Sequence, residues 1–131
     1  MADKDVVLAK LTLLESAFER FKEAVVDEPD RLTQDAAIHR FEFTFELVWK
    51  TLKSNLEFEG TGFFKSPREV LKHAHVVGYV NEPTIWEDML KARNTTAHTY
   101  DEALADQVYG SFATYIPAMT HLLSQLRKTY N

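Results

Sequence analysis

Apolar side chains recur at alternating steps of four and three residues along much of the chain, which is the pattern of helices that bury one face. The clearest runs lie in segments 3–27 and 102–131. Such steps are typical of the seam between helices that pack almost parallel to their neighbours. The two runs are Val7, Leu11, Leu14, Phe18, Phe21 and Val25, and Val108, Phe112, Tyr115, Met119, Leu122 and Leu126.

The segment 34–58 is predicted to be the central helix, with Thr33 as its N-cap. Its main apolar stripe is extended round the far side by Phe43 and Leu47, so this helix needs covering on two sides. A narrow polar strip remains. Two interpretations of this strip stay open: a solvated surface steadied by an ion pair four residues apart, or the wall of a cleft. The strip consists of His39, Glu42, Glu46, Lys50 and Lys53, with Trp49 at its edge.

Turn-forming residues separate five helical segments. Asp27-Glu28-Pro29-Asp30 ends the first, since proline cannot continue the hydrogen-bond ladder. After Gly60-Thr61-Gly62, the sequence Ser66-Pro67-Arg68-Glu69 forms a capping box for a short helix that ends near Gly78.

A fourth helix is predicted from about Pro83 to an end near His98, and a fifth from Glu102 to the end of the chain, with Asp101 as its N-cap. Pro117 is expected to kink this last helix. The pattern contains no strand-like alternation. It predicts an all-α fold, an antiparallel up-down four-helix bundle with one extra short helix, as a single domain over residues 1–131.

Composition narrows the functional classes. The chain has 131 residues, no Cys and a formal net charge of −5. The acidic balance argues against broad nonspecific nucleic-acid binding, and DNA is not expected as a ligand. No apolar run approaches the roughly 20 residues that cross a bilayer, and the first residues do not form a secretory signal, so a cytoplasmic protein without membrane contact is expected.

No cofactor and no metal site are expected. His73 and His75 stand two residues apart and cannot share a helical face, and no Cys is present to complete a zinc site. A glycine-rich nucleotide loop and a paired-Asp metal motif are also missing from the sequence, so the chain cannot itself be a nucleotidyltransferase.

Reactive side chains gather in the segment Lys91–Asp101. Arg93 and His98 are five residues apart, which on a continuous helix separates them by about 140°. Either the helix ends between them, or a second copy of the chain brings its own pair to a shared cleft.

Together an arginine and a histidine suit phosphate chemistry without a metal. A guanidinium can bind two phosphate oxygens and stabilise charge in the transition state. An imidazole can take a proton from a ribose 2′-hydroxyl or return one to a leaving oxygen. From spacing alone, a purely structural role stays open, with Arg93 in a salt bridge and His98 closing a helix.

The segment Arg93-Asn94-Thr95-Thr96-Ala97-His98-Thr99-Tyr100 resembles the R-x4-6-H motif of HEPN domains, and more narrowly the R-x4-H-x-Y form found beside a minimal nucleotidyltransferase. The second helical segment, from Arg40 to Lys53, is similar to the matching helix of that family, whose members are often labelled nucleotidyltransferase substrate-binding proteins. The likeness covers nearly the whole chain in length and helix order.

This resemblance implies a helical bundle that pairs as a homodimer and acts as a metal-independent ribonuclease toxin on an RNA such as tRNA or mRNA. It implies that Arg93 binds phosphate, that His98 is general acid or base and that Asn94 assists. Tyr100 would be the residue to which a partner minimal nucleotidyltransferase adds AMP, which blocks the cleft. Glu46 is expected to orient Arg93. The alternative is a noncatalytic subunit that presents a substrate to a separate nucleotidyltransferase.

Overall fold

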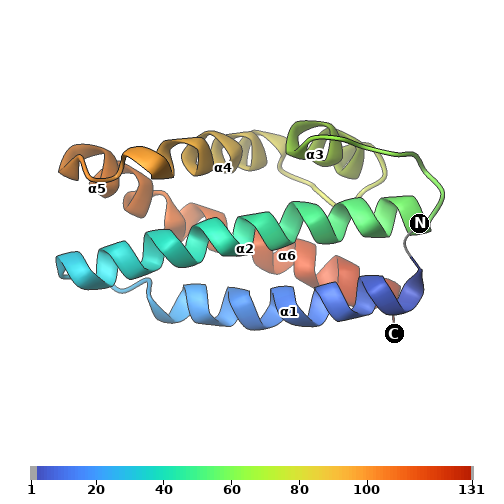
Figure 1. The fold of residues 1–131 in the computed structure, drawn as a ribbon, viewed down its shortest axis with the longest axis horizontal. Coiled ribbons are helices and arrows are strands. Elements are labelled where there is room, and N and C mark those ends of the chain that lie inside the picture. The colour runs from blue at the N-terminus through green and yellow to red at the C-terminus, as the bar shows by residue number, and fades with distance from the viewer. Residues whose placement is uncertain (1–2, 131) are drawn as a thin grey trace.

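Helices make up the whole fold of the computed structural model, which describes residues 3–130 (Figure 1). No strand occurs among these residues. Four long helices are joined by short connections that hold two shorter helices and a single 3-10 turn. In chain order the elements are α1 (Lys4–Glu23), α2 (Arg31–Phe58), α3 (Pro67–Val76), α4 (Pro83–Thr95), the 3-10 turn η1 (Thr96–His98), α5 (Glu102–Gly110) and α6 (Phe112–Thr129).

The four long helices alternate in direction, as Figure 1 shows. Helix α2 contacts α1 and α4, and α6 contacts the same two helices, so α2 and α6 stand diagonally across the bundle. The short α3 packs on α2 and α4, while η1 and α5 pack on α2 and α4 near the other end. The predicted all-α, antiparallel four-helix bundle is therefore confirmed.

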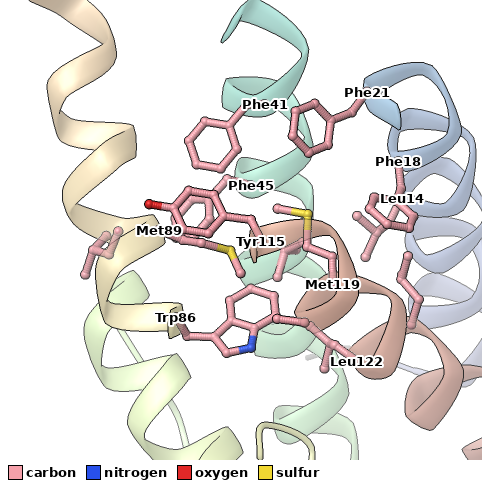
Figure 2. Packing of buried hydrophobic residues seen from close by; sticks show 14 of the residues in the cluster. Leu14, Phe18, Phe21, Phe41, Phe45, Trp86, Met89, Tyr115, Met119 and Leu122 are labelled. Carbon is pink, nitrogen blue, oxygen red and sulfur yellow. The ribbon is translucent and has the colours of Figure 1, made fainter. Parts of the chain in front are cut away.

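Aromatic side chains fill the space between the diagonal helices (Figure 2). The Phe41 ring on α2 lies 5.1 Å from Phe112 and 5.7 Å from Tyr115, centroid to centroid, and both partners come from α6. Phe21 from α1 meets Phe112 edge to face at 4.9 Å. Aromatic pairs prefer such tilted arrangements, and their burial contributes much of a helical core's stability. Trp86 and Met89 extend the same core along α4.

The first helix is shorter than the sequence pattern predicts. It ends at Glu23 rather than near Asp27. The Tyr109 hydroxyl accepts a hydrogen bond from the Val26 N–H at 2.7 Å and donates to the Val26 carbonyl at 2.6 Å. This distant side chain satisfies backbone groups that a further helical turn would otherwise use.

The second helix begins earlier than predicted, because Asp30 rather than Thr33 is its N-cap. The Asp30 carboxylate accepts from the Thr33 N–H at 2.7 Å, so Thr33 lies within the first turn. This hydrogen bond to the charged form lowers the pKa of Asp30 below its usual value. The predicted cap at Ser66 is confirmed, since its hydroxyl accepts from the Glu69 N–H at 3.2 Å.

The last predicted helix is in fact two helices, and the break between them lies before Pro117. Helix α5 ends at Gly110 and α6 begins at Phe112, with Ser111 between them. The Ser111 hydroxyl donates to the Gln107 carbonyl at 3.2 Å. Adjacent Gly and Ser residues and such back-bonding are recognised causes of helix breaks. Pro117 lies inside α6, about one and a half turns beyond the break.

Within residues 3–130, none of the helices is both long enough and apolar enough to cross a membrane.

Candidate active site

Arg93 lies in the last turn of α4 and contacts Glu46 in the middle of α2. Its Nε–H donates to Glu46 Oε1 at 2.8 Å, and its Nη2 also donates to the same oxygen. Both side chains are about one third exposed, at 30% for Arg93 and 32% for Glu46. The pair joins two helices across 47 residues of sequence. Charge-assisted contacts of this kind fix the plane of a guanidinium.

Two further side chains on α2 hold the Glu46 carboxylate. The Trp49 indole N–H donates to Glu46 Oε2 at 3.0 Å, and the Lys50 ammonium lies 3.9 Å from the same oxygen. Glu46 is therefore held from both sides, by Arg93 on one oxygen and by its own helix on the other. The Glu46–Lys50 pair that the sequence suggests is present.

Asn94 contacts the other side of the guanidinium. Its Oδ1 accepts from Arg93 Nη1 at 3.2 Å. An arginine has five N–H donors, so the contacts with Glu46 and Asn94 leave one N–H on Nη1 and one on Nη2. A guanidinium that keeps two N–H donors can bind two oxygens of a phosphate.

The α-helix ends after Arg93, which changes the angular separation predicted for Arg93 and His98. Residues Thr96–His98 form the 3-10 turn η1. The Thr96 hydroxyl donates to the Arg93 carbonyl at 2.7 Å, and the Thr99 hydroxyl donates to the Thr96 carbonyl at 2.9 Å. These hydroxyls satisfy carbonyls at the helix end, so the chain turns rather than continuing the helix.

His98 and Tyr100 lie together on the exposed side of this turn. Their rings are 6.2 Å apart between centroids and inclined at 72°. The Tyr100 side chain is 85% exposed. Asp101 follows and caps α5 as predicted, with its carboxylate accepting from the Ala103 N–H at 2.9 Å and the Leu104 N–H at 3.3 Å.

A shallow hollow of about 280 Å³ lies between this turn and α2. Thr99 and Tyr100 form one side of the hollow, and Asp35, His39 and Glu42 are among the residues of the other. These three α2 residues precede Glu46 at helical spacings, so all four fall on one stripe of α2. The stripe therefore runs from the hollow beside Tyr100 to the carboxylate that holds Arg93.

The structure thus brings the predicted residues into two neighbouring groups. Arg93, Asn94 and Glu46 form one hydrogen-bonded group, and His98 with Tyr100 forms the other. Among the described side chains, no hydrogen bond joins the two groups; the α2 stripe is their common neighbour. Of the two interpretations of the polar strip, the wall of a cleft fits His39 and Glu42, while the ion pair of the other is present between Glu46 and Lys50.

Several contacts of the site do not follow from the sequence prediction. Asp35 is absent from the predicted polar strip, although its spacing from His39 and Glu42 places it on the same stripe. The capping roles of Thr96 and Thr99 and the contact from Trp49 to Glu46 depend on three-dimensional placement. Over residues 3–130, no three His, Asp or Glu side chains gather in a way that could hold a metal ion.

Fold and site together define an all-helical bundle protein that presents an Arg, a His and a Tyr at the end of one helix against a carboxylate stripe of another. Comparison with protein families identifies the particular class. The chain matches the model of the "Nucleotidyltransferase substrate binding protein like" family over residues 9–128, and it belongs to that family.

Individual relatives agree with this assignment. A Haemophilus influenzae protein named "Probable ribonuclease HepT" is 31% identical over 137 residues, covering 90% of this chain and 92% of the relative. A crystal structure of a Thermus thermophilus protein has a TM-score of 0.83 at 35% identity and covers 87% of this chain and 98% of that one.

A second solved structure, from Haemophilus influenzae, is described as revealing the fold of a substrate binding domain of a nucleotidyltransferase. It has a TM-score of 0.75 at 28% identity, covering 89% of this chain and 98% of that one. The resemblance to HEPN proteins of the nucleotidyltransferase substrate-binding type is therefore confirmed.

Proposed function

We propose that this chain is a metal-independent endoribonuclease, the toxin of a toxin-antitoxin pair, and that Arg93 and His98 carry out the cleavage. The observation that carries the proposal is the Arg93 guanidinium held by Glu46 and Asn94 with two N–H donors left over, beside a turn that exposes His98. A relative covering nearly the whole chain and named a probable ribonuclease supports it.

The proposed reaction is internal transesterification of RNA. An imidazole of His98 takes the proton of a ribose 2′-hydroxyl, and the 2′-oxygen attacks the adjacent phosphorus. The bond from phosphorus to the 5′-oxygen breaks, and that oxygen takes a proton. The products are a 2′,3′-cyclic phosphate and a 5′-hydroxyl end. Arg93 stabilises the negative charge that builds on the phosphoryl oxygens.

A homodimer would supply a second imidazole as the acid. An apolar stripe on α2 supports such pairing, because Leu32 is 81% exposed and Phe43 is only partly buried. Exposed apolar residues at helical spacing favour burial against another helix. The α2 helix that bears this stripe also provides Glu46, so pairing there would place two copies of the site close together.

Tyr100 is the proposed control point. A partner minimal nucleotidyltransferase would transfer AMP from ATP to the Tyr100 hydroxyl, forming a phosphodiester and releasing pyrophosphate. The phenol is 85% exposed and its ring lies beside His98, so the added group would put bulk and negative charge at the cleft. Like charge repels an RNA phosphate and would stop cleavage.

The central test is cleavage of tRNA and of an mRNA in the presence of EDTA. We expect the wild type, shown by mass to carry no AMP, to produce 2′,3′-cyclic phosphate ends, and Arg93→Ala and His98→Ala to lose at least about a hundredfold in rate. His121→Ala, which removes a histidine on α6, serves as the matched control and should cleave normally. Equal activity in all four proteins would indicate a contaminating nuclease.

Mixing the two inactive variants tests the shared cleft. If Arg93 of one chain acts with His98 of the other, a mixed dimer of Arg93→Ala and His98→Ala contains one intact Arg–His pair and recovers part of the activity, although it lacks the second imidazole that would serve as the acid. If both residues act within one chain, every site in the mixed dimer lacks one residue and activity stays lost.

The alternative function is a noncatalytic subunit that presents a substrate to a nucleotidyltransferase. The matched family description and the solved neighbour described as a substrate binding domain favour it. Absence of cleavage by AMP-free wild type, together with stimulation of a co-purified nucleotidyltransferase, would support this function over the ribonuclease.

A further inference from the structure

A hollow with a mostly apolar floor lies between α3 and α4, away from the Arg93 turn. Its volume is about 420 Å³. Leu71 from α3, Leu90 from α4 and Val80 from the connection between them are among the residues that form its floor, and Trp86 lies at its inner wall. Hollows of about 300–1,000 Å³ lined by apolar side chains with a few polar groups are typical of small-molecule sites.

Trp86 gives this hollow a hydrogen-bond donor. Trp86 is only 1% exposed, and within residues 3–130 no hydrogen bond from its indole N–H is present. Among the described residues, two side chains have a polar atom that is both inaccessible to solvent and without a hydrogen-bond partner. These are Thr51 and His73, and the Trp86 nitrogen does not belong to this group. Because Trp86 also lines the hollow, a ligand there is the group that could accept from this N–H. In Figure 2 the nitrogen lies on the edge of the indole turned away from Phe45.

The rim of the hollow is basic, in a chain whose net charge is −5. Lys72 and His75 lie on α3, and Arg68 pairs with Glu87 across the opening at 3.2 Å. Glu87 offsets the charge of Arg68, so the Lys72 ammonium gives the rim one net positive charge. An anionic group above the rim therefore meets a complementary charge.

His75 has a fixed tautomer at this rim. Its Nδ1 lies 2.9 Å from the Val80 carbonyl oxygen, which can only accept, so Nδ1 carries the proton. The neutral ring then presents Nε2 as an acceptor, and the protonated ring presents a second donor. His75 can therefore bind either a hydroxyl or an anion.

We infer that this α3/α4 hollow binds a mononucleotide-sized anion whose flat heteroaromatic ring lies on the apolar floor with a ring nitrogen accepting from the Trp86 N–H, and whose phosphate lies by Lys72, His75 and Arg68. A flat ring with an acceptor at one end and an anion at the other matches all three features. The inference stands apart from the proposed ribonuclease, since none of these residues belongs to the Arg93 turn.

The two tryptophans of the chain provide the test. Trp86 lines the hollow, whereas the Trp49 N–H donates to Glu46 beside Arg93. Each gives its own indole signal in a proton–nitrogen correlation spectrum, assigned with Trp49→Phe. On titration with AMP, we expect the Trp86 signal to shift progressively and the Trp49 signal to stay in place. Movement of the Trp49 signal alone, or of neither at millimolar AMP, would overturn the inference.

Two truncated probes test the two halves of the ligand. Adenosine lacks the phosphate and inorganic phosphate lacks the ring, so each should bind at least about tenfold more weakly than AMP. If adenosine binds as well as AMP, the basic rim contributes nothing and the proposed anion site is wrong. If phosphate alone binds as well, the apolar floor is not used and the proposed ring site is wrong.

Rim variants complete the experiment. Lys72→Glu should weaken AMP binding at least about tenfold, while Glu87→Gln should tighten it by up to about fivefold because Arg68 is released from its partner. Both positions are exposed, so the fold should be retained. Lys128→Glu on α6 makes the same charge reversal outside the hollow and should leave binding unchanged. Equal weakening by Lys72→Glu and Lys128→Glu would show a nonspecific charge effect and overturn the site.

Discussion

Glu46 is the side chain on which the geometry of Arg93 depends. Two of the five guanidinium donors end on one Glu46 oxygen, while Trp49 binds the other. Because the Glu46 carboxylate is held by its own helix, its hydrogen bonds also hold the Arg93 guanidinium in one place. Glu46 contacts Arg93 rather than the substrate position, so its proposed part in the reaction is that of a positioning residue.

Replacing Glu46 with Gln tests this dependence. The amide keeps the shape but loses the charge and one acceptor, so Arg93 should move more freely. In the proposed ribonuclease, we expect kcat to fall about ten- to a hundredfold with KM nearly unchanged, since the lost order matters most in the transition state. The Trp49 indole signal should shift in the same variant. Full activity despite that shift would show that Glu46 does not position Arg93 for catalysis.

The Tyr130 phenol has a pKa well above the usual value of a tyrosine. Burial, reinforced by the negative charge of Glu59, raises the pKa of Tyr130 from 10.0 to about 12. Its hydroxyl donates to Asn55, which in turn donates to Glu59 at 3.0 Å. The neutral phenol is therefore the form that the folded end of the bundle requires.

A raised folded-state pKa gives stability that is fully present below the unfolded value and lost as the pH rises through the folded value. For Tyr130, the free energy of unfolding should therefore fall as the pH rises from 10.0 to about 12. Urea unfolding across this range measures the fall. In Tyr130→Phe the stability should start lower and depend less on pH there. An unchanged alkaline slope in this variant would assign the effect to other groups, Tyr79 first among them.

At the scale of elements, helix identity follows from local pattern but helix ends do not. The four-three spacing of apolar residues predicts each long helix, because residues at these steps lie on one face of a helix and that face is buried. The end of α1 depends on the Tyr109 hydroxyl, which binds Val26 from 83 residues away. Nothing near Val26 in sequence carries that information. The break at Ser111 does have a local signal in the Gly110-Ser111 pair, although the proline beyond it is the stronger breaker by residue type.

Gly110 and Gly78 form a matched pair for testing this local physics. Gly110 ends α5 without a positive φ, and a Cβ there would meet no heavy atom within 4 Å. Gly110→Ala should therefore stabilise the protein by about 0.5–1 kcal/mol. Gly78 has a φ of +98°, where an L side chain is strained, so Gly78→Ala should destabilise it by about 1 kcal/mol or more. Thermal unfolding of both variants shows whether the stability rises in Gly110→Ala and falls in Gly78→Ala. The same sign in both would show that backbone freedom is not what these glycines supply.

For the whole molecule, the diagonal contact between α2 and α6 is the central packing interaction. Phe41 is fully buried and meets rings from α1 and α6. Truncating such a side chain removes apolar contacts and leaves a cavity.

We expect Phe41→Ala to cost about 3–5 kcal/mol and Phe41→Leu clearly less, because leucine fills most of the space. Natural domains are stable by only about 5–15 kcal/mol, so the alanine variant should be close to unfolding at physiological temperature. Urea unfolding measures the loss of unfolding free energy in both variants. A cost below about 1 kcal/mol for Phe41→Ala would show that the diagonal contact is not central.

The candidate site is predictable in its residues but not in its arrangement. The types and order of Arg93, His98 and Tyr100 suggest phosphate chemistry only together with the family resemblance, because their spacing alone leaves a structural role open. Their grouping depends on where η1 turns the chain and on which face of α2 it meets. The pairing of Arg93 with Glu46 spans 47 residues, and only the packing of α4 on α2 brings the two side chains together.

The antiparallel arrangement has a practical consequence for protein engineering. Helix α1 begins and α6 ends at the same end of the bundle, while the turn that holds His98 lies at the opposite end (Figure 1). A fluorescent reporter or surface tether attached at either terminus would therefore extend away from the Arg93 turn. Immobilised on a sensor through such a tether, the protein would still offer that turn to RNA or to a partner enzyme in solution.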